Sequence, residues 1–197
     1  MPKAAKGIAR RDFLRGSAAV SAAAAMAGVG VHYLYAAGSD QLKIGLIGCG
    51  GRGSGAAGQA MQAAQNVAIW AVGDVWPEKA AAGASRFKVP EDRAFSGLDA
   101  CQKVLASGAN SVILATPPGF RSIHFEAAIK AGKHVFMEKP VCVDPVGYRR
   151  VVAAAEEAAQ KKLCVVAGTQ RRHTASYREC IKRIHDGAIG DIVGGQC

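Results

Sequence analysis

The sequence contains no grouping of residues that typically binds a metal. Its six cysteines are dispersed, with no CxxC pair and no cluster of cysteine and histidine, so the spacings typical of zinc sites are absent. We interpret the cysteines as buried thiols that act as small hydrophobic side chains, with disulfides as the open alternative if the protein is exported. This interpretation applies first to Cys49, in a glycine-rich segment, and to Cys164, in an apolar run.

Aromatic residues are also scarce. Phe, Trp and Tyr make up 6% of the 197 residues, and the Lys and Arg residues behind the net charge of +10 are scattered along the chain. Proteins that bind nucleic acid typically show a basic stripe with interleaved aromatic residues, so this class of partner is not expected. With 50% hydrophobic and 20% charged residues, the composition is that of an ordinary globular protein.

No hydrophobic run in the first 37 residues is apolar enough for a stable membrane span. The segment Gly16–Val31 is rich in Ala and Gly and contains no Leu, which makes it weakly apolar. It follows Arg10-Arg11-Asp12-Phe13-Leu14-Arg15, which resembles the twin-arginine export signal of bacteria. We therefore expect the twin-arginine export machinery to recognise residues 1–37, and the protein to be periplasmic or otherwise exported. The alternative is a basic, alanine-rich tail.

From Leu42 onward, short apolar runs alternate with helical stretches. This alternation predicts an α/β fold in which a parallel sheet is covered on both faces, here a doubly wound Rossmann domain over residues 38–168. The start of the last helix is clear, because Asp144 can cap it and Pro145 suits its first turn. The expected strands are 42–47, 67–72, 94–95, 111–115, 134–137 and 163–167, and the expected helices are 53–65, 77–88, 99–107, 122–131 and 145–162.

A glycine-rich segment follows the first expected strand. Gly48-Cys49-Gly50-Gly51-Arg52-Gly53 matches the pattern GxGxxG, and Asp74 comes 21 residues after Gly53, close to the spacing of an acid that binds the adenosine ribose. Gly48 permits a sharp turn, Gly50 lets the backbone approach a pyrophosphate, and Gly53 lets helix pack on strand. Because Asp74 would repel a 2′-phosphate, we favour NAD over NADP, although Arg52 could partly offset the repulsion.

Two further polar segments lie where strands are expected to end. Thr116-Pro117 follows the fourth strand, and Glu138-Lys139-Pro140 follows the fifth. Ligands of open α/β sheets bind at the carboxyl ends of the strands, so both segments are candidates for the site. A lysine there can hold an alkoxide, or act as a base when burial lowers its pKa. The alternative is a surface lysine that pairs with Glu138.

Four segments form a combination that is more specific than any one of them: Gly48–Gly53, Thr116-Pro117 with His124 beyond it, Gly132-Lys133-His134-Val135, and Glu138-Lys139-Pro140. Together they resemble the Gfo/Idh/MocA family, the group of glucose–fructose oxidoreductase and inositol dehydrogenase. The resemblance implies that Lys139 assists proton transfer at the reacting hydroxyl, while Glu138 and the Thr116-Pro117 loop contact the nicotinamide half of the cofactor. It places His124 near the nicotinamide, either in contact or as a helix-terminal hydrogen bonder.

Residues 169–197 are expected to begin a second, substrate-binding α/β domain, which the resemblance also implies. A helix at 176–185 and the opening of a strand at 191–193 cannot close a core alone. The family carries an Asp/His pair in that domain, and this sequence shows no such motif. We therefore expect a fragment that binds nucleotide but turns over poorly, and that forms a homo-oligomer when full length. Arg172, at the domain crossover, would contact substrate or, preferably, make interdomain ion pairs.

The sequence thus predicts an NAD(P)-dependent oxidoreductase. It would transfer a hydride between the hydroxyl-bearing carbon of a sugar or polyol and a nicotinamide cofactor, with Lys139 helping to remove the hydroxyl proton. One alternative is an NAD-dependent glycoside hydrolase of the same family, which oxidises its sugar only transiently. The other is a non-catalytic nucleotide-binding fragment. The sequence does not specify which sugar or polyol is used.

Overall fold

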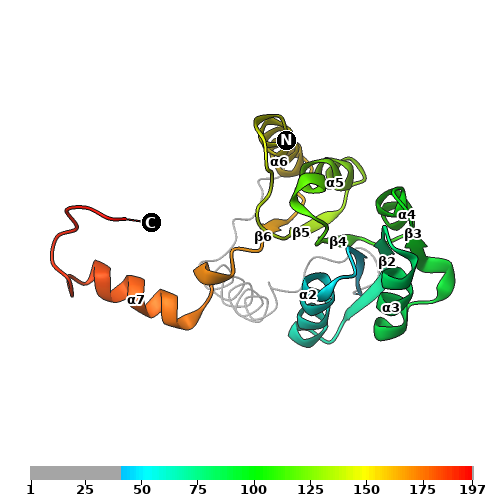
Figure 1. Ribbon diagram of the computed structural model, residues 1–197, viewed down its shortest axis with the longest axis horizontal. Coiled ribbons are helices and arrows are strands. Elements are labelled where there is room, and N and C mark those ends of the chain that lie inside the picture. The colour runs from blue at the N-terminus through cyan, green and yellow to red at the C-terminus, as the bar shows by residue number, and fades with distance from the viewer. Residues whose placement is uncertain (1–40, 197) are drawn as a thin grey trace, which may run out of the picture. The chain divides into compact units, whose positions relative to one another are not determined.

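The computed structural model describes residues 41–196, so the expected twin-arginine leader lies outside the described residues. Its strands are β1 (Leu42–Ile47), β2 (Val67–Asp74), β3 (Ala94–Ser96), β4 (Ser111–Leu114), β5 (His134–Met137) and β6 (Val165–Ala167). They form one sheet in the order β3-β2-β1-β4-β5-β6, and every neighbouring pair is parallel (Figure 1). β2 and β3 are added on one side of β1, whereas β4, β5 and β6 are added on the other. An open α/β sheet leaves a crevice at its carboxyl edge where the order of its strands reverses in this way, here between β1 and β4.

Helices cover both faces of the sheet. They are α2 (Gly51–Ala63), α3 (Pro77–Phe87), α4 (Ala100–Ala106), α5 (Pro118–Lys130) and α6 (Pro145–Gln160), and α7 (Ala175–His185) follows the last strand. Alternate residues of β1 point to opposite faces. Leu46 therefore belongs to the core under α2 and α3, whereas Ile47 belongs to the core under α4, α5 and α6.

The predicted fold class is confirmed, and the strands lie close to their expected positions. α5 begins at Pro118 rather than at residue 122, because Pro117 occupies the N-cap and Pro118 the first turn, where the missing amide hydrogen of proline costs no helical bond. The side chain of Asp144 caps α6 as expected, accepting a hydrogen bond from the amide of Gly147 at 2.7 Å.

Two expectations are wrong. Residues 191–193 form no strand, and Val193 is fully exposed at 100%, because no described strand lies beside it to pair with its backbone. Cys164 is exposed rather than buried. It directly precedes β6, an edge strand, and shares a side of that strand with the half-exposed Val166. The five described cysteines are all free; Cys49 and Cys101 are buried as expected, whereas Cys142 is only half-buried and Cys180 is exposed.

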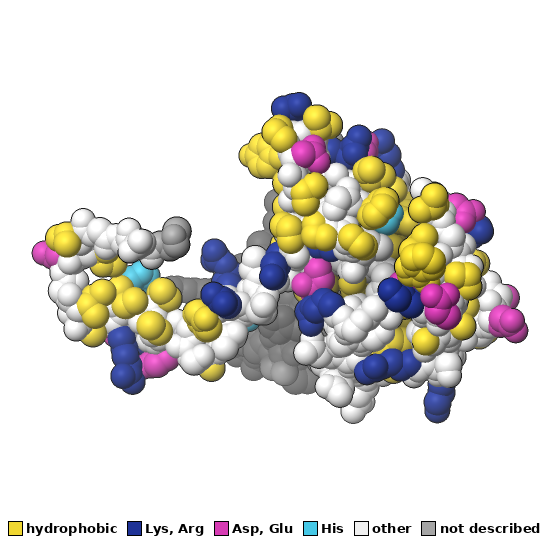
Figure 2. Space-filling model, viewed as in Figure 1, with side chains coloured by type: hydrophobic (Ala, Val, Ile, Leu, Met, Phe, Trp, Pro, Cys, Tyr) yellow, Lys and Arg dark blue, Asp and Glu magenta, His cyan; other side chains and the backbone are white. Residues whose placement is uncertain are grey.

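Hydrophobic side chains remain exposed on the last two helices. α7 buries none of its residues, and Tyr177 and Ile181 are exposed. Val146 and Tyr148 of α6 are exposed as well, and yellow side chains gather over α6 in Figure 2. The second domain remains a prediction for this part of the chain. None of the helices within residues 41–196 is both long enough and apolar enough to cross a membrane.

Candidate dinucleotide site

The glycine loop links β1 to α2, and two of its glycines lie very close to other backbone atoms. Gly48 has φ +97°, and a Cβ there would lie 2.7 Å from the backbone carbon of Ala115. A Cβ at Gly53 would lie 1.9 Å from the carbonyl oxygen of Gly48. Neither position can hold a side chain, because real Cβ atoms do not approach other atoms so closely. The two glycines therefore set α2 against the end of β1, and β1 against the segment after β4.

Gly50 is different, because its surroundings are empty. A Cβ at this position would meet no atom within 4 Å, and the backbone is extended at φ −67° and ψ −179°. The first bond of α2 runs from the amide of Ser54 to the carbonyl of Gly50 at 2.9 Å. The amides between these two residues thus have no partner inside the helix, and no acid lies in its first turn. This end of α2 is suited to an anionic group.

The carboxylate of Asp74 is oriented by two backbone amides. One oxygen accepts from the amide of Cys49 at 2.8 Å, and the other accepts from the amide of Trp76 at 3.1 Å. Asp74 ends β2 and is partly buried. Because each carboxylate oxygen has two lone pairs, both can still accept from a sugar hydroxyl. The acid predicted from its spacing therefore lies against the glycine loop in a fixed orientation.

The Cys49 thiol belongs to the core and not to the loop surface. Its sulfur lies 3.6 Å from the carbonyl oxygen of Gly73, and a Cβ at Gly83 would lie 3.0 Å from it. Burial, and next the charge of Asp74, raise the pKa of Cys49 from 9.0 to about 12. The thiol stays protonated at neutral pH and packs as a small hydrophobic group under α3.

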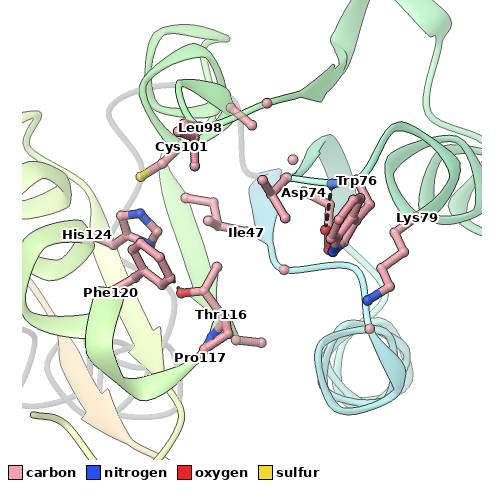
Figure 3. Close-up of a pocket in the computed structure, with 17 residues that line it drawn as sticks. Ile47, Asp74, Trp76, Lys79, Leu98, Cys101, Thr116, Pro117, Phe120 and His124 are labelled. Atoms are coloured by element: carbon pink, nitrogen blue, oxygen red, sulfur yellow. Dashed lines mark hydrogen bonds between the residues drawn. The ribbon is translucent and has the colours of Figure 1, made fainter. Parts of the chain in front are cut away.

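A cleft of about 260 Å³ opens at the carboxyl ends of β1, β2 and β4. Figure 3 shows Asp74, Trp76 and Lys79 along one side of it, Thr116, Phe120 and His124 along the other, and Ile47 between them. The predicted site residues that line it are Gly48, Gly50, Asp74, Thr116, Pro117 and His124. The structure thus joins the glycine loop, Asp74 and the Thr116-Pro117 loop in one cleft.

His124 supports the wall formed by the Thr116-Pro117 loop. Its Nδ1 lies 3.1 Å from the Thr116 hydroxyl, and its ring stacks on Phe120 with the centroids 5.9 Å apart. Burial, and then the nearby charge of Arg121, lower the pKa of His124. A neutral imidazole results, which would not repel the positive ring of an oxidised nicotinamide. His124 therefore lines the cleft and contacts Thr116, but the expectation that it starts the helix is wrong, because α5 begins six residues earlier at Pro118.

An ion pair crosses from the glycine loop to the end of β5. Arg52 donates from Nε to Oε1 of Glu138 at 2.7 Å, and a second guanidinium nitrogen lies 2.6 Å from the same oxygen. The Glu138 side chain is 8% exposed, whereas that of Arg52 is 52% exposed. Arg52 is thus paired with Glu138, and no ion pair joins it to Asp74 among the described residues. Neither side chain lines the cleft described above.

Lys139 and Arg172 lie outside this cleft. Lys139 is exposed, and its ammonium makes no ion pair or hydrogen bond with the described residues, so it is not paired with Glu138. It follows β5, beside the end of β4, whose Leu114 carbonyl accepts from the amide of Glu138 at 3.0 Å. Arg172 is exposed in a short 3-10 helix, Gln170–Arg172, and lines a separate hollow beside α7.

Several residues of the site were not found from the sequence. Trp76, Lys79 and Leu98 line the cleft around Asp74, and the position of Trp76 two residues after Asp74 is a signal that could have found it. Arg121 is buried at 2% exposure and donates to backbone carbonyls of both neighbouring loops. Nothing in the sequence separates this arginine from a surface residue of α5.

The geometry fits a dinucleotide with two phosphates between two sugars. Asp74 would hold the adenosine ribose, and Trp76 and Leu98 offer apolar surface for the base beside it. Gly50 and the unpaired amides of α2 leave room and positive potential for the pyrophosphate. Thr116, Pro117 and His124 form the opposite end. Residues 41–196 contain no group of His, Cys, Asp and Glu that could hold a metal.

The fold and the cleft define a Rossmann-type dinucleotide-binding domain. The sequence model of the Gfo/Idh/MocA family, an oxidoreductase family with an NAD-binding Rossmann fold, matches residues 42–168. The chain belongs to this family. It is 35% identical over 157 residues to inositol 2-dehydrogenase 4 of Saccharopolyspora erythraea, an alignment that covers 76% of the chain and 43% of that relative. The chain thus spans less than half the length of the curated relatives that it matches.

Solved structures agree with the fold. The scyllo-inositol dehydrogenase of Lactobacillus casei, with bound NAD(H) and scyllo-inositol, has a TM-score of 0.64 and 29% identity, covering 77% of this chain and 43% of its own. A 3-ketoreductase of Actinomadura kijaniata in complex with NADP also has a TM-score of 0.64, at 23% identity, and covers 77% of this chain and 46% of its own. The second similarity shows the fold alone.

The contrast between Gly50 and Gly53 leads to a paired prediction. Gly50→Val should abolish dinucleotide binding, because its methyl groups would fill the space for the phosphates, while stability changes by less than about 0.5 kcal/mol. Gly53→Ala should instead destabilise the domain by about 3 kcal/mol, because its methyl group would overlap the Gly48 carbonyl. Calorimetric titration with NAD and urea unfolding measure the two effects. Full NAD affinity in folded Gly50→Val would contradict this assignment of the phosphate site.

Proposed function

We propose that the complete protein is an NAD-dependent oxidoreductase of a sugar or polyol, with a cyclic polyol such as an inositol as the first candidate. The observation that carries the proposal is the order of groups along the carboxyl edge of the sheet. Asp74 stands at one end of the cleft, Thr116 and His124 stand at the other, and Lys139 follows on the next strand. Two relatives of at least 30% identity are inositol 2-dehydrogenases, which supports the substrate class.

In this proposal Lys139 handles the proton of the reacting hydroxyl. A bound nicotinamide ring would supply the hydride acceptor at the Thr116-Pro117 wall. The Lys139 ammonium has no ion pair or hydrogen bond among the described residues, so it is available to a substrate oxygen. The residues described here provide cofactor positioning and one proton-handling group; the remaining substrate contacts would come from outside the described cleft.

The proposed preference for NAD rests on Asp74. Its carboxylate stays beside the position of the adenosine ribose because two backbone amides hold it there. The guanidinium of Arg52 is paired with Glu138, which would compete with a 2′-phosphate for it. Lys79 also lines the cleft near Asp74, so a cation close enough to weaken the preference is present. We therefore propose NAD as the preferred cofactor, with NADP as a weaker ligand.

Replacing Lys139 by Ala should lower turnover at least about 100-fold, because proton transfer by a positioned group is lost. Affinity for NAD should change less than about twofold, since Lys139 does not line the cleft. The measurement is the initial rate of NADH formation with inositols and free sugars, in the complete protein. Lys130→Ala is the matched control. Lys130 is the last residue of α5, at the end of the helix away from the Thr116-Pro117 loop, and forms an exposed ion pair with Glu126.

A Lys139→Ala enzyme with an unchanged rate would remove Lys139 from the reaction. The same assay separates the alternatives for the whole protein. Release of an aglycone from a nitrophenyl glycoside without net NADH formation would indicate a redox glycosidase. NAD binding with neither activity in the complete protein would indicate a non-catalytic binding module.

Replacing Asp74 by Ala should weaken NAD binding about tenfold or more, because charged hydrogen bonds to the ribose are lost. NADP binding should weaken less or improve, since the repulsion of its 2′-phosphate is removed. Titration of each variant with both cofactors gives the ratio. Asp99→Ala, which removes an exposed acid paired with Lys103, should leave the ratio unchanged. An unaltered ratio in Asp74→Ala would show that Asp74 does not select the cofactor.

We also propose that the protein is exported by the twin-arginine route, supported by the pair Arg10-Arg11 ahead of an Ala-rich segment. Replacing both by Lys should leave the protein in the cytoplasm, because the export receptor recognises the arginine pair. Cell fractionation and immunoblotting measure the distribution, with Arg15→Lys as the control outside the pair. Undiminished periplasmic protein in the double variant would refute the proposal.

A further inference from the structure

Arg121 is the one described cation that is buried at 2% exposure, and it does not line the cleft. Its guanidinium donates to three backbone carbonyls, those of Thr116, Glu138 and Pro140. The first belongs to the loop after β4, and the other two belong to the segment after β5. A single side chain thus binds both of the loops that are proposed to surround the reacting groups.

The position of Arg121 on α5 explains this reach. The residue lies in the first turns of the helix, and helical side chains point back toward the helix N-terminus. The backbone pairing of β4 with β5 ends where the amide of Glu138 donates to the carbonyl of Leu114 at 3.0 Å. Beyond this bond the two loops have separate courses. The guanidinium supplies the next connection between them.

Arg121 also holds the backbone on both sides of Lys139. Its Nη1 donates to the carbonyl of Glu138 and to that of Pro140, the latter at 3.3 Å. The Lys139 side chain, in contrast, is exposed and free of described partners. The ammonium of Lys139 can therefore move, but the backbone from which it extends is fixed relative to Thr116.

Packing alone does not account for an arginine at this place. Burial lowers the pKa of Arg121, although the Glu138 carboxylate opposes this change, so the charge is held against a desolvation cost. The Nε atom is buried and has no hydrogen-bond partner among the described residues. An apolar side chain of similar size would avoid both costs. What it could not provide is the set of hydrogen bonds to two different loops.

We propose that Arg121 is a positioning residue that sets the distance between the nicotinamide wall at Thr116 and the backbone of Lys139. This inference rests on the proposed function, since it concerns the nicotinamide end of the site. It assigns Arg121 no contact with cofactor or substrate. Its loss should therefore disturb the nicotinamide end of the cleft while leaving the end at Asp74 unchanged.

The test compares two ligands in Arg121→Met, which keeps side-chain length and removes the hydrogen bonds. ADP-ribose lacks only the nicotinamide, so its affinity should stay within about twofold of the unaltered protein. NADH should bind at least about tenfold more weakly, because its nicotinamide loses an ordered wall. The fluorescence enhancement and anisotropy of bound NADH should fall as well, since the ring is held less rigidly.

Two further variants make the result specific. Arg121→Lys keeps the charge but lacks the planar fork that reaches both loops, so it should not restore the NADH signal. Arg93→Met is the matched control. Arg93 is only partly buried but, like Arg121, has a buried nitrogen without a hydrogen-bond partner; its guanidinium packs 3.8 Å from the ring centroid of Trp70, and it does not line the cleft. It should lower thermal stability without changing the ratio of NADH to ADP-ribose affinity.

Other outcomes would overturn the proposal. Unchanged NADH affinity and fluorescence in folded Arg121→Met would show that the loops keep their spacing without the guanidinium. Equal weakening of both ligands, or failure of both Arg121 variants to fold, would assign Arg121 to general stability. Absence of ADP-ribose and NADH binding in the unaltered protein is a separate result, and it would refute the proposed function itself.

Discussion

The contact between two glycines is the constraint on which the site depends. The carbonyl of Gly48 occupies the place where any side chain at position 53 would begin, and Gly48 itself lies against the backbone of Ala115 and Thr116. These contacts bring the end of β1, the start of α2 and the loop after β4 together without intervening atoms. The strand order reverses between β1 and β4, so the crevice of the open sheet and the free amides of α2 coincide at this point.

Charged side chains then fix the loops that the glycines bring together. The Asp74 carboxylate binds the amide of Cys49, which holds the end of β2 to the glycine loop. The Arg52–Glu138 pair joins the same loop to the end of β5, and Arg121 joins the end of β5 to that of β4. Each connection uses an ionised group and at least one partly buried partner, where such bonds are stronger than in water. The carboxyl edge of the sheet is thereby more ordered than its backbone pairing alone would make it.

Much of this arrangement could be predicted from the sequence, because it follows from local patterns. The apolar runs set the strands, and the spacing of Gly48, Gly53 and Asp74 indicated the candidate site, whose cleft Gly48 and Asp74 line. Cys164 and residues 191–193 were misjudged because an apolar run does not show whether a neighbour will cover it. The bonds of Arg52 and Arg121 were missed for a related reason. They join segments distant in the chain, and only the folded sheet shows that one arginine meets a carboxylate and the other meets three carbonyls.

The contrast between a fixed backbone and a free side chain at Lys139 has a chemical consequence. A group that handles a proton must approach within hydrogen-bond distance of a substrate oxygen, yet it must not already be neutralised by a carboxylate. Glu138 is the adjacent acid, and its carboxylate is already bound by Arg52, while its carbonyl is bound by Arg121. Arg52 therefore occupies the carboxylate that precedes the lysine in the chain, while Arg121 holds the backbone between them. Because Lys139 is exposed among the described residues, the proposed role would require a bound substrate and cofactor to desolvate its ammonium, which would tie the reactivity of the lysine to binding.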